Sequence, residues 1–196
     1  MLHRGFSKGA DVAEARWPLG KTVAILILVW VLLGLLPMLA RMIVGAGFVP
    51  STQWASSAGT YGLVAGLATA LLLLWVVQKA PRDEKDTDLW RFAGASAALL
   101  FGFMIGKNVV DVTGPMAIAL VAGDETELQF SVERADGGRV KGCPSPVELE
   151  GLPMLFDRAC GVPQAVRDSL APGMNIILTG RGTSLGIFAR QITRAD

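Results

Sequence analysis

The stretch "VAILILVWVLLGLLPMLA", residues 23–40, decides the class of protein. It contains no charged side chain, and Arg41 after it is followed by Met-Ile-Val-Gly-Ala-Gly. An uncharged run of this length is about what a helix needs to cross a bilayer. Because it begins only after a tail of mixed charge and lacks a strong cleavage site, we interpret it as a retained helix and not as a signal peptide. We predict the first transmembrane helix over residues 22–46.

Two more apolar runs follow, in a chain that is 52% hydrophobic with a mean hydropathy of +0.46. Residues 56–78 lie in an uncharged segment with Trp54 and Trp75 at its ends, as in an interfacial aromatic belt. Residues 90–109 form a third, shorter run. The next segment, "VTGPMAIALVAG", is too short for a further span. We leave open whether residues 112–123 form a strand or an interfacial segment.

The positions of lysine and arginine indicate the orientation. Basic residues lie in the N-terminal tail, residues 1–21, and in the loop between the second and third helices, whereas the loop between the first and second helices has none. Basic loops face the cytoplasm. We therefore predict a multi-pass protein of a bacterial inner membrane, with a cytoplasmic N-terminus, a transmembrane domain over residues 22–110 and a periplasmic domain over residues 111–196.

The predicted periplasmic domain has a β pattern. "ELQFSVERA" alternates apolar and polar residues, and "ADGGR" is a hairpin turn signal before a returning strand in "RVKGC". "MNIILTGRG" and "LGIFARQITRA" read as a second hairpin, and "VPQAVRDSLAPG" as a short helix between the two hairpins. We predict a small, mainly β domain, and the order of its elements favours an OB-like barrel. That fold alone says nothing about a ligand.

Cys143 and Cys160 are the only cysteines of the chain. In an oxidising compartment, two cysteines in a small domain are most simply paired, and closing such a loop contributes roughly 3 kcal/mol. The alternative is a pair of free thiols in a domain that faces the cytoplasm. A metal site is disfavoured because the single histidine, His3, lies in the tail, and a redox pair usually has Cys-x-x-Cys spacing.

Small residues recur every fourth position in two of the predicted helices. Such stripes let helix backbones approach closely in lipid. They support two interpretations: a hairpin within one chain, or contact between chains in a homo-oligomer. The helix-packing candidates are Ala58, Gly62, Gly66 and Ala70 in one helix and Gly94, Ala98, Gly102 and Gly106 in the other.

Arg41 and Lys107 lie near the outer ends of their predicted helices. Long basic side chains at this depth reach the headgroups, so lipid contact is the simpler interpretation. The alternative is a ring of basic groups that lines a pore between protomers. Pro37 predicts a bend before Arg41, and the backbone group that it frees needs a partner.

No catalytic residue can be assigned from the sequence. The chain has no nucleotide-binding loop. The predicted periplasmic domain, here also called the outer domain, has no histidine and its carboxylates are scattered. Acidic residues outnumber basic ones there, which disfavours nucleic acid. We expect no enzyme activity, no metal and no cofactor. The expected partners are membrane lipids, further copies of the chain and another envelope or membrane protein.

These observations give one principal hypothesis. We expect a homo-oligomeric membrane protein that acts as an envelope sensor, a defence component, or an accessory or scaffold subunit through its outer domain. The alternative is a channel or transporter component with Arg41 and Lys107 along a path between protomers. An enzyme acting on lipid or envelope polymer is a third hypothesis, for which the sequence offers no nucleophile and base.

Overall fold

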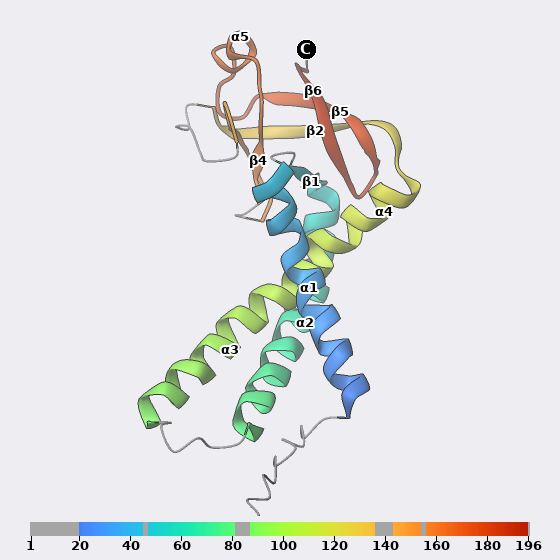
Figure 1. The fold of residues 1–196 in the computed structure, drawn as a ribbon. Coiled ribbons are helices and arrows are strands. Elements are labelled where there is room, and N and C mark those ends of the chain that lie inside the picture. The colour runs from blue at the N-terminus through green and yellow to red at the C-terminus, as the bar shows by residue number, and fades with distance from the viewer. Residues whose placement is uncertain (1–19, 45–46, 81–86, 136–142, 154–155, 196) are drawn as a thin grey trace, which may run out of the picture.

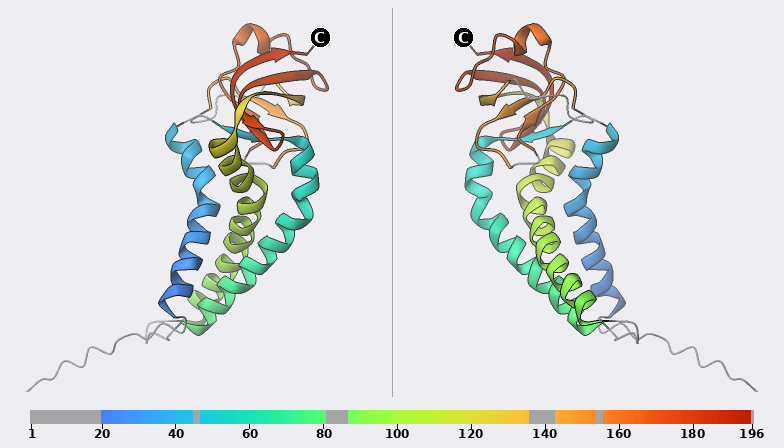
Figure 2. Two further views of the ribbon diagram at one scale, coloured as in Figure 1. Left: turned by 90° about the vertical axis from the view of Figure 1, so that its right-hand side faces the viewer. Right: turned by 90° about the vertical axis from the view of Figure 1, so that its left-hand side faces the viewer.

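The structure is a computed structural model that describes residues 20–44, 47–80, 87–135, 143–153 and 156–195. Long helices form one half of the molecule and a small β barrel forms the other (Figure 1). The beginning of the first helix, the end of the second and the beginning of the third all lie at the end of the helical half that is away from the barrel (Figure 2).

The three expected long helices are present as α1 (Lys21–Val44), α2 (Thr52–Lys79) and α3 (Asp88–Asn108). By length and composition, the structure contains three helices able to cross a membrane. Helix α2 begins at a conventional cap, because the Ser51 hydroxyl accepts a hydrogen bond from the Trp54 amide at 3.1 Å. Many large apolar side chains on the outer faces of these helices are exposed.

The helical path does not end with α3. It continues through a single π-helical segment, η1 (Val109–Thr113), into α4 (Gly114–Ala122). The strand interpretation of residues 112–123 is therefore wrong. Val112, Met116 and Ala119 recur at helical spacing and are buried in one cluster, and Pro115 directly follows the π-helical turn inside this continuous helical path.

A six-stranded antiparallel sheet forms the nearly closed, barrel-like C-terminal half. Its strands are β1 (Phe48–Pro50), β2 (Asp124–Arg134), β3 (Val147–Leu149), β4 (Arg158–Ala159), β5 (Asn175–Thr183) and β6 (Gly186–Arg194), in the order β1-β6-β5-β2-β3-β4. The expected hairpin of β5 and β6 is confirmed, and the short helix α5 (Gln164–Arg167) precedes it. The expected strand after "ADGGR" lies almost entirely outside the described residues.

Strand β1 comes from the connection between α1 and α2. It pairs with β6, with Phe48 opposite Phe188 and Val49 opposite Ile187. No pattern in the sequence indicates this strand, because three residues are too few to show a period of two. The barrel is thus completed by a segment far from residues 111–196.

Two hydrophobic clusters hold the molecule together. The larger one fills the barrel around Phe130, Leu149, Ile176 and Leu178. The smaller one lies where the barrel meets the helices and contains Phe48, Val112, Met116, Ala119 and Phe156, with Phe188 packed against it. Since β1, η1, α4 and β6 all contribute to it, the smaller cluster fixes the barrel to the helices.

Candidate functional site: a charged pair between the helices

The most unusual group in the helical half is a charged pair at the junction of α3 and η1. The ammonium group of Lys107 donates to Oδ2 of Asp111, one helical turn further on. The side chain of Lys107 is 39% exposed, whereas that of Asp111 is only 3% exposed. Burying a carboxylate among apolar helices costs free energy that its ion pair must offset. Because its burial is energetically unfavourable, Asp111 is the leading candidate for a functional residue.

Helix α2 makes room for the carboxylate with a glycine. A Cβ atom placed on Gly62 would overlap Oδ1 of Asp111. Oδ1 is buried and has no hydrogen-bond partner among the described residues. Asp111 also lies in the π-helical turn, and isolated π turns inside α-helices often occur at functional sites. One carboxylate oxygen is therefore committed to Lys107, and the other faces the backbone of α2.

The same π-helical turn repairs a break in α1. Pro37 has no amide hydrogen, so the carbonyl of Leu33, four residues earlier, has no partner within its own helix. The hydroxyl of Thr113 donates to that carbonyl oxygen at 2.8 Å. Thr113 is buried, and this bond therefore ties α1 to η1 where both would otherwise leave a polar group unsatisfied.

A second polar link joins α1 to α2. The indole Nε1 of Trp30 donates to the Thr69 hydroxyl at 3.0 Å, and that hydroxyl donates to the Ala65 carbonyl at 2.8 Å. All the polar groups of this link are satisfied within the chain. It holds two helices that otherwise contact each other little.

The two stripes of small residues face one another within the chain. Ala58, Gly62, Gly66 and Ala70 are all buried in α2, as are Ala98, Gly102 and Gly106 in α3. A Cβ on Gly102 would lie 2.8 Å from the α-carbon of Ala70, and one on Gly94 would lie 3.8 Å from Val77. The stripes therefore provide the close approach of α2 and α3, and contact between chains would have to use other faces.

Arg41 lies in a different environment from Lys107. It belongs to a charged cluster at the base of the barrel. Arg41 interacts electrostatically with Asp157 and Arg158. The Arg158 guanidinium bonds Glu148 at 2.9 Å, and its Nε is 3.7 Å from Oδ1 of Asp157. Burial raises the pKa of the Asp157 carboxyl, and the neighbouring Arg158 opposes this shift. The two basic residues suggested for a pore thus each have acidic neighbours.

Cys143 and Cys160 form a disulfide, as expected from the sequence. It joins residues 17 positions apart, with a Cα–Cα distance of 5.0 Å. Cys143 is buried and lies before β3, and Cys160 directly follows β4. The bond therefore connects the two ends of the segment that contributes the short strands β3 and β4.

The polar groups described above form ion pairs or link one helix to another by hydrogen bonds. Within the described part of the chain, no three His, Cys, Asp or Glu side chains gather in a way that could hold a metal ion. Sequence reasoning missed Asp111 because it was assigned to the start of the outer domain. The available signal was its four-residue spacing from Lys107 inside an otherwise apolar run.

Comparisons with protein-family models, with curated proteins and with solved structures find no match for this chain.

Proposed function

We propose that this chain is a non-enzymatic, multi-pass protein of the bacterial inner membrane. In this proposal, it is an accessory or sensor subunit of a larger envelope assembly, with its N-terminus in the cytoplasm and its barrel in the periplasm. The observation that carries the proposal is the joint between barrel and helices. Strand β1 enters the barrel from between α1 and α2, and α4 leads directly from the helices into β2.

This joint is well suited to transmit force or position. The Arg181 side chain on β5 donates to the carbonyls of Leu120 and Gly123 at 3.0 and 3.1 Å, and so holds the end of α4 against the sheet. The Phe48–Phe188 ring pair adds a contact with centroids 5.1 Å apart. A partner that binds the barrel would therefore act on the helices without a flexible linker between them.

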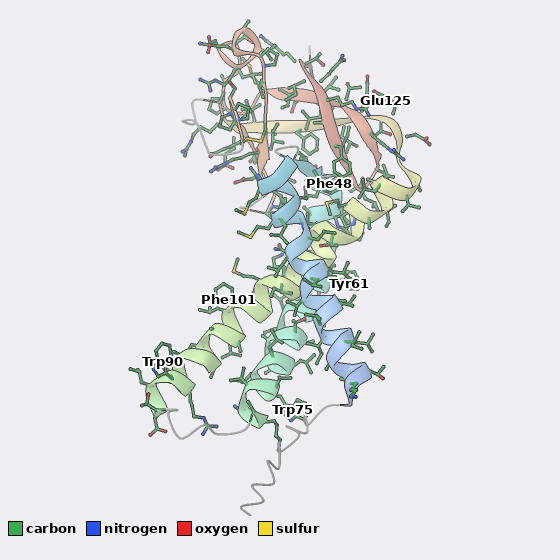
Figure 3. All side chains as sticks on the ribbon, in the orientation of Figure 1. Phe48, Tyr61, Trp75, Trp90, Phe101 and Glu125 are labelled. Atoms are coloured by element: carbon green, nitrogen blue, oxygen red, sulfur yellow. A yellow bond between two sulfur atoms is a disulfide. The ribbon has the colours of Figure 1, made fainter. Side chains whose placement is uncertain are left out.

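The proposed orientation is supported by the position of the basic residues and by the disulfide. Lys21, Lys79 and Arg91 all lie at the helix ends away from the barrel (Figure 1). Trp75 and Trp90 lie near that same end, where an aromatic belt is expected (Figure 3). A disulfide forms most readily outside the cytoplasm, which favours the barrel on the opposite side.

We further propose that the barrel is a divergent OB-like module. Strands β2 to β6 have the expected element order, with the helix α5 between the third and fourth of these five strands. The sixth strand, β1, pairs with β6 near β4, since a Cβ on Gly47 would lie 3.8 Å from the Arg158 carbonyl oxygen. β1 thus fills the gap that would otherwise separate the two edges of a five-stranded barrel.

Assembly with other chains is the third part of the proposal. The side chains of Trp90 and Phe101 on α3 are exposed and lie on the side of that helix away from α2, whose small residues are buried. Figure 3 shows Trp90 and Phe101 on this outer side of α3. An apolar helix face of this kind requires lipid or a neighbouring helix. We expect copies of the chain to associate through α3, and the barrel to contact another envelope protein.

Site-specific photocrosslinking in native membranes tests these contacts. A photoreactive phenylalanine analogue at Phe101 should give adducts between copies of the chain, and at Glu125, which is exposed on β2, it should give an adduct with a second protein. The same analogue at Phe130, inside the barrel, is the matched control for non-specific reaction. A chain that is monomeric in mild detergent and yields no adduct from either exposed position would refute the proposal.

A further inference from the structure

An apolar groove runs between α1 and α2 on the outside of the helical half. It is a shallow, largely open feature with a volume of about 520 Å³. Val23, Leu26, Ile27 and Trp30 line it from α1, and the face of α2 from Ala65 to Leu72 lines the other side. We call this feature the α1–α2 groove. Its lining is almost entirely apolar, so its occupant must be apolar as well.

The floor of the groove leaves nothing for a polar ligand to bind. The only polar side chains in the lining, Trp30 and Thr69, bond each other, and Thr69 also bonds Ala65. All residues that line the groove, except Ala65 and Ala68, carry large or branched side chains. Helices pack in lipid through small residues on both sides, and the small stripe of α2 is already buried against α3. A thin, flexible hydrocarbon chain fits this crevice better than a second helix does.

The charge beside the groove indicates the headgroup. Lys79 follows Leu72 by seven residues, which places it on the same face of α2 about 10 Å closer to the helix end. Lys79 is exposed, and no ion pair involving it occurs among the described residues. Lys21, the first residue of α1, lies at the same end of the molecule. A chain lying in the groove would bring its headgroup to a basic helix end.

We propose that the α1–α2 groove binds one acyl chain of an anionic phospholipid, whose phosphate headgroup is held by Lys79. The inference rests on the membrane insertion that forms part of the proposed function. It adds a defined lipid site on the side of the helices away from the barrel. The ligand is a lipid and not a free phosphate, because the apolar groove supplies most of the contact area.

Quenching of Trp30 fluorescence by brominated lipid tests the site. The full-length chain, with Trp17, Trp54, Trp75 and Trp90 replaced by Phe, is reconstituted into phosphatidylcholine vesicles. The vesicles contain a minor fraction of phosphatidylglycerol or phosphatidylcholine with dibrominated acyl chains. We expect the brominated phosphatidylglycerol to associate with the site roughly fivefold more strongly at equal mole fraction, since one lysine near the surface supplies about that preference.

Three variants make the result specific. Lys79→Gln should abolish the preference for the anionic lipid, and Lys79→Arg should keep it. Ala68→Leu should fill the groove and reduce quenching by both lipids. Arg91→Gln is the matched control, because it removes a charge at the same end of the molecule from α3, which does not line the groove.

The outcomes separate this inference from the proposed function. Equal quenching by the two lipids, or a preference that survives Lys79→Gln, would overturn the lipid site while leaving membrane insertion intact. No quenching by either lipid would overturn both. Native mass spectrometry of the chain with all its tryptophans, released from membranes in mild detergent, gives an independent measurement. There we expect one retained anionic phospholipid per chain, and its loss in the Lys79→Gln variant.

Discussion

The Thr113 hydroxyl donates to the Leu33 carbonyl oxygen at 2.8 Å, and that carbonyl is the one that Pro37 deprives of its helical partner. A defect in one helix is thus compensated by a side chain from another, 80 residues later in the sequence. The compensation depends on the π-helical turn, in which Thr113 is buried. Helix α1 is therefore held at its weakest point by the element that also carries Asp111.

This relationship predicts a specific coupling between two positions. Thr113→Val keeps the shape of the side chain but leaves the Leu33 carbonyl unsatisfied, which should lower the free energy of unfolding by about 1–3 kcal/mol. In a Pro37→Ala background, the new amide can bond Leu33, so the loss should become smaller. The unfolding of the parent chain, the two single variants and the double variant in bicelles measures this double-mutant cycle. Strictly additive losses would contradict the assignment.

Gly62 provides a second prediction, with a control in the same helix. Gly62→Ala should destabilise the protein, because the added methyl group would overlap the Asp111 carboxylate. A Cβ on Gly59 meets no atom within 4 Å, so Gly59→Ala should be stabilising by up to about 1 kcal/mol through helix propensity alone. Thermal unfolding of both variants compares them. Equal behaviour of the two would mean that the carboxylate does not lie against α2.

The charged pair should respond asymmetrically to loss of either partner. Lys107→Met leaves a charge on a side chain that is 3% exposed, whereas Asp111→Asn leaves a lysine that is 39% exposed and can turn outward. We expect Lys107→Met to cost up to about 3–5 kcal/mol, and Asp111→Asn clearly less. Denaturant titration in mixed micelles measures the difference. The reverse order of stabilities would contradict the burial of Asp111.

Asp157 predicts a dependence of stability on pH. Burial raises its pKa in the folded protein above the ordinary value of 3.8. At a pH between 3.8 and the folded pKa, the folded state therefore binds more protons than the unfolded state. The contribution of Asp157 to the free energy of unfolding is therefore fully present below pH 3.8 and is lost as the pH rises through the folded pKa.

Asp157→Asn should remove this dependence. The variant should gain melting temperature relative to the parent chain at neutral pH, and the gain should disappear in the acidic range. Asp168→Asn, at an exposed position, serves as the control. A variant that loses stability at neutral pH would show that attraction to Arg158 and Arg41 outweighs burial.

The disulfide should stabilise the barrel more than the helices. Replacing Cys143 and Cys160 by Ser should lower the free energy of unfolding by about 3 kcal/mol, given a sequence separation of 17 residues. Reduction of the parent chain should have the same effect, since the chain contains no other cysteine. Circular dichroism in the presence and absence of reductant measures this. An unchanged melting temperature after verified reduction would contradict the prediction.

The parts of the fold that could be predicted carry their signal within a short window. The long helices are visible as uninterrupted apolar runs, and β5 and β6 as alternating segments around a glycine-rich turn. The disulfide followed from the number of cysteines and the expected compartment. For the helices and the hairpin, neighbouring residues determine the structure without reference to distant ones.

The remaining parts depend on contacts between distant residues. Phe48 is a strand residue only because Phe188 is available beside it, and nothing in "FVP" announces that partner. Residues 112–123 are too short to predict a further span, yet they continue the helix because η1 and α4 pack in the smaller hydrophobic cluster. Asp111 was overlooked for the same reason. Its importance comes from burial against Gly62, which only the assembled helices produce.

The position of β1 also sets the order in which the protein can be completed. Residues 48–50 are synthesised well before the strand that they pair with, which spans Gly186–Arg194. Contacts so distant in sequence form late, so β1 stays unpaired until β6 is available. Until then Phe48 and Val49, which are buried in the folded protein, lack the strand that pairs with them, and apolar surface exposed in this way during folding favours aggregation.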